Sequence, residues 1–339
     1  MTLMLIDGLE DSTTAGNMNY ASSPPQPAPA RNGLGYQLNS GASHYVGWST
    51  PQLLATALGW TIGFAMKASV FSSTANYMVT FIGDNGIAQG IFILNTDASI
   101  SFKRGTSGSI MGTSAPGIVQ LNSWCYVEVQ YLYASTNTGT AIVRVNNTVV
   151  LTLTNINTAS TSPSTSIQTP YLGYPGSANQ GMTVDDVYIC QGATPDPFLG
   201  DIVVETLYPN GNGTKNQWQG SDGDNTNNYL LVNEVGYPNT STYTKDSVIG
   251  DQDMYALDNM KTVAGQVVGV CHVAYAVKTD SGPAQFKVVS HGTADTKSPN
   301  CAVRTGSDGW TFTLAQNPDT SAAWTIADVN NLQSGVEIS

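Results

Sequence analysis

Acidic side chains are the first residues in this sequence whose types and spacing could do chemistry. Paired carboxylates can cleave glycosidic bonds, and clustered oxygen atoms can bind cations. The most noticeable pair is Asp185 and Asp186, in the segment TVDDVYIC. Adjacent residues of a strand point to opposite faces of a sheet, so we predict that this pair does not converge as a catalytic dyad.

A second acidic segment, SDGDNTNN at residues 221–228, has oxygen-bearing side chains at alternate positions, as calcium loops do. The match then fails, because a calcium loop of this kind has Gly at its sixth position and Glu at its twelfth. Here these positions hold Asn227 and Asn233. We therefore favour solvated turns in which Asx side chains bond the backbone, and we predict no metal and no cofactor.

Histidines and cysteines form no recognisable site. His44, His272 and His291 are far apart in the sequence, and the four cysteines show neither metal spacing nor a CxxC motif. Cys125 shares a predicted strand face with valines, whereas Cys190 alternates away from its apolar neighbours. A disulfide between these two cysteines is therefore not expected, and we predict free thiols.

Aromatic residues are the remaining lead. The chain has 6 Trp and 16 Tyr, most of them at alternating strand positions that indicate a core role. Tyr171, Tyr174 and Tyr237 each lie in a Gly- or Pro-rich loop instead. We predict these three as candidates for contact with a glycan or a partner, with burial in the core as the alternative.

Composition limits the class of protein. The net charge is −12 with only 12 basic residues, which argues against nucleic acid as a partner. No apolar run approaches the roughly 20 residues that span a bilayer. The amino terminus lacks the basic start and long apolar core of a signal peptide, so folding in a cytoplasm is expected.

Short alternating segments predict the elements that would position these residues. Gly59 to Ala68 and Trp124 to Tyr133 alternate apolar and other residues, as half-buried strands do. Ala141 to Val145 and Val149 to Leu153 flank Asn146-Asn147, which predicts a hairpin. Strands about ten residues apart indicate a sandwich or barrel, and no helical period is apparent in this half of the chain beyond a short candidate at Thr50 to Ala57.

A Pro-bearing link, Ala193 to Pro197, divides the chain. We predict two antiparallel β-sandwich (jelly-roll) domains in tandem, residues 1–195 and 196–339. In the second, Asp201 to Leu207 is predicted as a strand and Val263 to Val277 as a central strand buried on both faces. Thr325 to Gly335 predicts a short helix, with Thr325 as N-cap and Gly335 near the C-cap.

Several segments in order resemble one family. LIDGLED, LNSWCYVEVQ, the RVNN hairpin, TVDDVYIC and FLGDIVVETLYPNGNGTKNQW are similar to the laminin-G or concanavalin-A-like jelly roll and its continuation in virion structural proteins of tailed bacteriophages. The closing segment WTIADVNNLQSGVEI extends the likeness over nearly the whole chain.

The resemblance implies a non-enzymatic virion protein, with a tail-associated fibre or adhesin-like component as first choice. A capsid decoration or head-fibre protein and a carbohydrate-binding lectin module are the alternatives. It implies assembly in the host cytoplasm, location in the virion, contact with other virion proteins, a homo-oligomer for which a trimer is the guess, and a host-surface glycan as a candidate ligand.

The resemblance also bears on the acidic residues. In such folds a segment like that around Asp185 and Asp186 more often bonds backbone donors near a sheet edge than does chemistry, with metal contact as the alternative. Sugar-cleaving relatives of the fold carry an ExDxxE strand motif, and none of the five Glu here begins one. We therefore predict no enzymatic activity.

Overall fold

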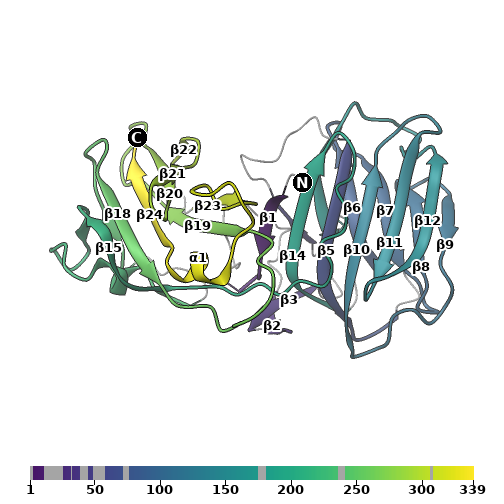
Figure 1. The fold of residues 1–339 in the computed structure, drawn as a ribbon. Helices are drawn as coiled ribbons and strands as arrows, with labels where there is room; N and C mark the ends of the chain where they lie inside the picture. The colour runs from purple at the N-terminus through teal and green to yellow at the C-terminus, as the bar shows by residue number, and fades with distance from the viewer. Residues whose placement is uncertain are drawn as a thin grey trace. The chain divides into compact units, whose positions relative to one another are not determined.

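The computed structural model describes residues 3–10, 26–31, 33–38, 45–48, 58–71, 76–174, 181–235, 241–305 and 308–339. Tyr237 and the helix candidate Thr50 to Ala57 lie outside these ranges. The chain folds as an all-β protein of antiparallel sheets, as the alternating segments predict (Figure 1). Within the described ranges, no helix has the length and apolar character that crossing a membrane requires.

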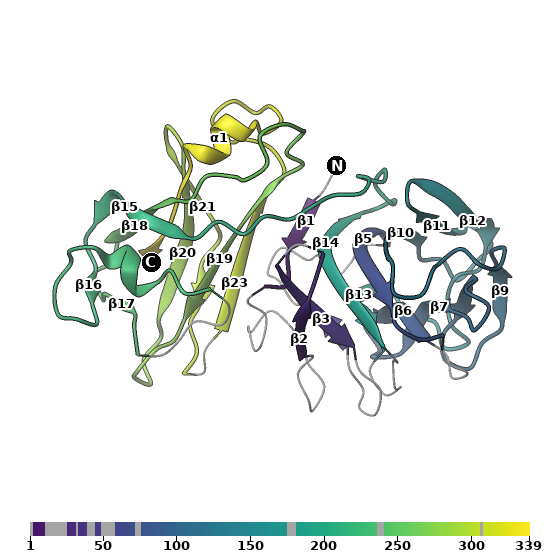
Figure 2. The same cartoon turned by 90° about the horizontal axis from the view of Figure 1, so that it is seen from below.

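Two sheets make up the first unit (Figures 1 and 2). The larger has the order β12-β11-β10-β5-β14-β3-β2, with β1 also paired to β14, and the smaller has the order β4-β13-β6-β7-β8-β9. The strands are β1 (Leu3–Asp7), β2 (Gln26–Pro29), β3 (Leu34–Leu38), β4 (Tyr45–Gly47), β5 (Gly59–Ala68), β6 (Asn76–Gly83), β7 (Ala88–Leu94), β8 (Ile100–Arg104), β9 (Ile110–Thr113), β10 (Trp124–Leu132), β11 (Gly139–Val145), β12 (Thr148–Ile156), β13 (Ile167–Gly173) and β14 (Met182–Gly192).

Large side chains from both sheets fill the space between them. Phe81 of β6 stacks on Tyr131 of β10 with ring centroids 4.3 Å apart, and Phe81 also meets Trp60 of β5 at 6.3 Å. All three are fully buried. The predicted hairpin is present, and Asn146 and Asn147 both have the positive φ that its two-residue turn requires.

The second unit is a smaller sandwich. A six-stranded sheet has the order β15-β18-β24-β20-β21, with β22 also paired to β20, and the pair β19-β23 packs against it. Its elements are β15 (Pro209–Asn216), β16 (Gln219–Gly220), the 3₁₀ turn η1 (Asn228–Leu231), β17 (Thr244–Lys245), β18 (Gln252–Leu257), β19 (Val270–Ala276), β20 (Gln285–His291), β21 (Asp295–Lys297), β22 (Cys301–Ala302), β23 (Asp308–Leu314), α1 (Ile326–Asn330) and β24 (Gln333–Ile338).

Two strand predictions for this half are wrong. Asp201 to Leu207 is irregular, and the next strand is β15, Pro209–Asn216. Only Val270–Ala276 of the predicted central strand is extended, and it is partly exposed because its sheet has two strands. Val263, predicted to be buried, is 88% exposed.

The helix prediction is right at its start and wrong at its end. Thr325 Oγ1 accepts the N–H of Asp328, and the Asp328 carboxylate accepts the N–H of Thr325, which is a reciprocal capping box. Gly335 is not a C-cap but lies within β24. A Cβ on Gly335 would come within 2.2 Å of Asp253 O, so this strand position requires glycine.

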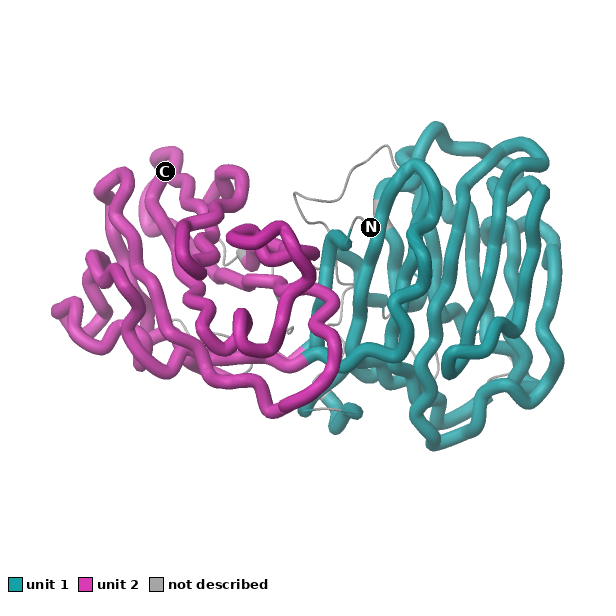
Figure 3. The backbone as a smooth tube through the Cα atoms, in the orientation of Figure 1, with its two compact units in different colours: residues 1–9, 18–204 teal, residues 10–17, 205–339 magenta. Residues whose placement is uncertain are grey.

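Contacts divide the chain into two compact units, coloured in Figure 3. The division falls between Val204 and Glu205, whereas the sequence predicts a boundary after residue 195. The segment from Asp196 to Val204 belongs to the first unit because it is bonded to the outer side of the larger sheet. Independent folding of the two domains stays a prediction.

Candidate functional site

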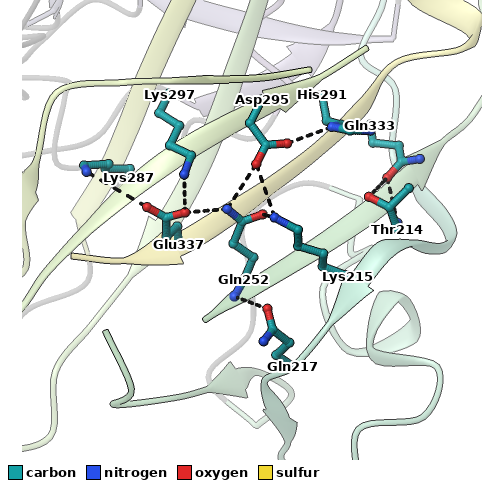
Figure 4. Close-up of polar contacts among 10 residues, drawn as sticks. All are labelled: Thr214, Lys215, Gln217, Gln252, Lys287, His291, Asp295, Lys297, Gln333 and Glu337. Atoms are coloured by element: carbon teal, nitrogen blue, oxygen red, sulfur yellow. Dashed lines mark hydrogen bonds and ion pairs between the residues drawn. The ribbon is translucent and has the colours of Figure 1, made fainter. Parts of the chain in front are cut away.

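One side of the six-stranded sheet in the second unit is polar. Val288 of β20 and Val336 of β24 pack in the apolar cluster shared with β23, so alternate residues of these strands point to the opposite side. We call this side the outer face (Figure 4). It comprises Lys215, Gln252, Lys287, His291, Asp295, Lys297, Gln333 and Glu337.

Glu337 is one centre of the outer face. Its side chain is 10% exposed, and Lys297 Nζ lies 2.5 Å from Oε2, while Lys287 Nζ lies 3.9 Å from Oε1. Gln252 Nε2 also donates to Oε2. Burial raises the pKa of the Glu337 carboxyl, but the bonds from Lys297 and Gln252 outweigh it, so this pKa lies below its ordinary value.

Asp295 is the second centre. His291 Nδ1 lies 2.7 Å from Oδ1, and Lys215 Nζ and Gln252 Nε2 lie 3.3 and 3.2 Å from Oδ2. Burial raises the pKa of Asp295, and these three partners lower it further than burial raises it. The bond through Nδ1 fixes the imidazole ring and leaves Nε2 without a hydrogen bond to any residue that the structure describes.

These ion pairs limit the chemistry of the outer face. Gln252 Nε2 bonds both carboxylates, so Asp295 and Glu337 lie close together, as in a glycosidase. A glycosidase needs one carboxyl group that stays protonated, and here both pKa values are lowered. Three ammonium groups against two carboxylates instead leave a charge of 3 − 2 = +1 with His291 neutral. The arrangement suits an anionic ligand.

β15 completes the outer face by approaching it closely. A Cβ on Gly213 would lie 2.5 Å from Gln333 Oε1 and 2.7 Å from Met254 O, so glycine is required here. Thr214 then donates through its N–H and its hydroxyl to Gln333 Oε1 at 2.8 and 3.1 Å. Sequence analysis missed this site because its residues come from five strands whose pairing no local pattern encodes.

Two of the three predicted tyrosines, Tyr171 and Tyr174, lie in the first unit, and Tyr237 is outside the described residues. Tyr171 and Tyr174 are both partly buried over a cluster of Ile82, Ala88, Ile91 and Ile93. The structure adds two further tyrosines to them. Tyr45 meets Tyr171 edge-on at 4.8 Å, and Tyr77 meets Tyr174 at 5.3 Å.

As predicted, the carboxylates of Asp185 and Asp186 accept hydrogen bonds from backbone N–H groups. Asp185 accepts the N–H of Arg31 at 3.0 Å, and Asp186 accepts the N–H of Val204 at 2.7 Å. Two premises of the prediction for Asp185 and Asp186 were wrong. β14 is an inner strand rather than an edge, and it is bulged between Asp185 and Tyr188, with Asp186 at φ 50°, so simple alternation does not apply.

Glu128 of β10 is a buried carboxylate at the centre of a hydrogen-bond network on the outer side of the larger sheet. It accepts bonds from Arg144 Nε at 2.6 Å, Tyr188 Oη at 2.5 Å and the N–H of Gly200 at 2.8 Å. Burial and the charge of Glu128 raise the pKa of Tyr188 well above its ordinary value, so the phenol stays a donor. The segment around Gly200 covers this centre, which indicates a structural role.

We assign no functional site to the cysteines. All four are free thiols, as predicted. Burial raises the pKa of Cys125 and of Cys190 to about 12, which leaves neither as a thiolate near neutral pH. Cys190 faces outward from the sheet as predicted, since it pairs with Thr61, yet it is fully buried.

Fold and site together define an all-β sandwich protein with a partly exposed sheet face of mixed charge. No family model matches the sequence. No curated protein matches it either.

Several solved structures align with part of this chain at low similarity. The endo-β-1,4-glucuronan lyase of the fungus Trichoderma reesei is 13% identical over 56% of this chain and 96% of its own, with a TM-score of 0.40. Alginate lyase Aly36B is 13% identical over 57% of this chain and 98% of its own, at 0.38. Trypanosoma rangeli sialidase is 10% identical over 56% of this chain, which spans only 30% of the sialidase, at 0.39.

These comparisons correct two predictions. The chain was expected to be a non-enzymatic virion structural protein, but the structures that it resembles are polysaccharide lyases and sialidases, and none of these three is a virion protein. At this identity and these TM-scores, no residue role is carried over to this chain. Membership of the phage family, location in the virion, the partners and the oligomer are tested by none of these comparisons and stay predictions.

Proposed function

We propose that the second unit binds an acidic glycan on its outer face. The observation that carries this proposal is the gathering of Lys215, Lys287 and Lys297 on one side of a sheet, in a chain that has 12 basic residues and a net charge of −12. Their side chains are 30–44% exposed, so the ammonium groups remain accessible to a ligand.

The uncharged donors of the outer face support a ligand rich in hydroxyl groups. Gln333 Oε1 is occupied by Thr214, which leaves Gln333 Nε2 directed away from that bond and without a partner among the residues described. His291 Nε2 offers a further hydrogen-bonding atom. A densely charged polyphosphate would be repelled by the rest of the chain, whereas a sugar with spaced carboxylate or sulfate groups needs only a few cations.

We expect Lys287→Gln to weaken acidic-glycan binding about tenfold, since a hydrogen bond to a charged group contributes roughly 1.5–3 kcal/mol. Lys287 is the informative position because its contact with Glu337, at 3.9 Å, is the longest of the ion pairs there. Binding of uronate-containing, sulfated and neutral polysaccharides would be measured by isothermal titration calorimetry at two salt concentrations.

The matched control is Lys245→Gln, which removes an exposed lysine from β17, outside the outer face. It should leave binding unchanged. The proposal is wrong if no acidic polysaccharide binds, if neutral polysaccharides bind equally well, or if the two variants lose affinity to the same extent.

The tyrosine cluster of the first unit is a second candidate surface for glycan contact. The observation that favours it is the gathering of Tyr45, Tyr77, Tyr171 and Tyr174. Aromatic faces bind the apolar faces of sugar rings without needing charge. We expect Tyr174→Ala to weaken binding of neutral glycans several-fold in the same titrations, while Lys287→Gln leaves that binding unchanged. Equal binding by wild type and Tyr174→Ala would exclude this surface.

A further inference from the structure

Asn228, at the start of η1, is fully buried and its amide has one defined orientation. Nδ2 donates to Trp218 O at 2.9 Å and to Asp253 Oδ2 at 2.7 Å. Both partners are acceptors, so the nitrogen must face them and the amide cannot be flipped. Asn228 Oδ1 therefore points elsewhere, and no donor among the described residues meets it.

Gly220 shows where this oxygen points. A Cβ built on Gly220 would lie 3.2 Å from Asn228 Oδ1 and 2.4 Å from Asp222 Oδ1. The two oxygens therefore lie on the same side of Gly220 and at most 3.2 + 2.4 = 5.6 Å apart. Asp222 is exposed, whereas Asn228 Oδ1 is buried, and Leu231 Cδ1 lies 2.5 Å from the same Cβ position.

A buried carboxylate adds negative charge behind the amide. Asp253 is fully buried, and its Oδ2 accepts bonds from Asn228 Nδ2 and from Tyr255 Oη at 2.7 Å. Its Oδ1, like that of Asn228, has no donor among the residues described. An unpaired buried acceptor costs about 1–3 kcal/mol, so Asn228 Oδ1 favours an electropositive occupant.

We propose that Asp222 Oδ1 and Asn228 Oδ1 bind a hard divalent cation, Ca²⁺. Carboxylate and amide oxygens are the ligands that this ion prefers, and opposite ligands at 2.3–2.6 Å can span roughly 5 Å. No group of three or more His, Cys, Asp or Glu in the described ranges could hold a metal ion. The proposed site differs because one of its two ligands is an amide oxygen, and solvent completes the coordination.

The acidic turns alone would not support this inference. Asp222 Oδ1 accepts the N–H of Asp224 at 3.4 Å and Asp224 Oδ1 accepts the N–H of Thr226 at 2.7 Å, which are the Asx turns that the sequence predicts. The buried amide oxygen of Asn228 is the independent observation. Binding of Ca²⁺ here is separate from the glycan proposal, since the site lies on the loop before η1 and needs no sugar.

The test uses the full chain without glycan. The melting temperature would be measured in a chelator and in about 10 mM CaCl₂, above the millimolar Kd of weak calcium sites. Tb³⁺ would be titrated as a luminescent Ca²⁺ substitute, with Trp218 as the nearby sensitiser. We expect a rise of the melting temperature with CaCl₂, a smaller rise with MgCl₂, and Tb³⁺ luminescence that Ca²⁺ displaces.

Asp222→Ala should weaken Ca²⁺ binding at least tenfold, and because Asp222 is exposed the variant is expected to fold. The control is Asp280→Ala, at an exposed aspartate that also caps a turn, through a 3.0 Å bond from the N–H of Gly282. Asn228→Ala, which risks unfolding, is not needed. If CaCl₂ leaves the melting temperature unchanged, or if Asp222→Ala and Asp280→Ala respond alike, the site holds at most water and the proposal is overturned.

Discussion

Glu128→Ala is expected to destabilise the first unit by about 3–5 kcal/mol, the usual cost of removing one partner from a buried ion pair. The Glu128 side chain is 1% exposed and that of Arg144 is 19% exposed. Without the carboxylate, the Arg144 charge loses its counter-ion, and Tyr188 and the N–H of Gly200 lose their acceptor. The measurement is denaturant unfolding of the full chain.

Glu128→Gln removes the negative charge of the side chain but keeps its shape, so it tests the two contributions separately. The amide oxygen can still accept from Tyr188 and Gly200, but the amide nitrogen faces the Arg144 donor. We therefore expect an intermediate loss of stability. Gln120→Ala, at an exposed turn of the same unit, is the control and should change the free energy of unfolding by less than about 0.5 kcal/mol.

Hydrogen exchange would localise the effect. Because Glu128 holds the segment around Gly200 on the sheet, Glu128→Ala should also speed amide exchange from Phe198 to Val204. Full stability of Glu128→Ala, or unchanged exchange in that segment, would show that the buried pair does not fix it.

The irregular segment that follows Gly200 also shows why part of the fold could not be predicted from the sequence. Asp201 to Leu207 has the alternating residues of a strand. Instead, Val204 within this segment donates its N–H to Asp186, and Gly200 just before it donates its N–H to Glu128. Strand propensity yields to such tertiary bonds, and these are invisible to a local pattern.

By contrast, β5 and β10 were predictable because their large apolar residues alternate, although β5 is buried on both faces and not half-buried as predicted. Tyr131 and Trp60 alternate inward and also pair with each other in register. The outer face of the second unit had no such signal. Lys287 and Glu337 are 50 positions apart in the sequence, yet the register pairs them directly. A charged residue within a strand predicts exposure, but not which charge lies opposite.

The acid stability of the second unit is expected to depend on His272. This β19 residue is 4% exposed, and its Nδ1 lies 2.8 Å from Ser334 Oγ. Burial lowers the pKa of His272 to about 4 from its ordinary 6.5. In the folded protein the ring therefore stays neutral, while the unfolded chain binds a proton below pH 6.5.

The sign of the effect follows from this difference. More protons bind to the unfolded state as the pH falls, so stability is fully present above pH 6.5 and is lost progressively down to pH 4. The pKa difference between 6.5 and about 4, at about 1.4 kcal/mol per pH unit, gives a loss of roughly 3.5 kcal/mol. Asp295 and Glu337, whose pKa values are lowered, lose their contributions only at more acidic pH.

Denaturant unfolding from pH 7.5 to 4.5 would measure this loss in wild type, His272→Gln and Ser334→Ala. We expect His272→Gln to be less stable at pH 7.5, since it loses the contact of the imidazole with the Phe312 ring at 6.3 Å, but to have a flatter pH profile. Ser334→Ala keeps the buried imidazole and should keep the steep profile. If wild type and His272→Gln lose stability in parallel as the pH falls, another group controls acid unfolding of this unit.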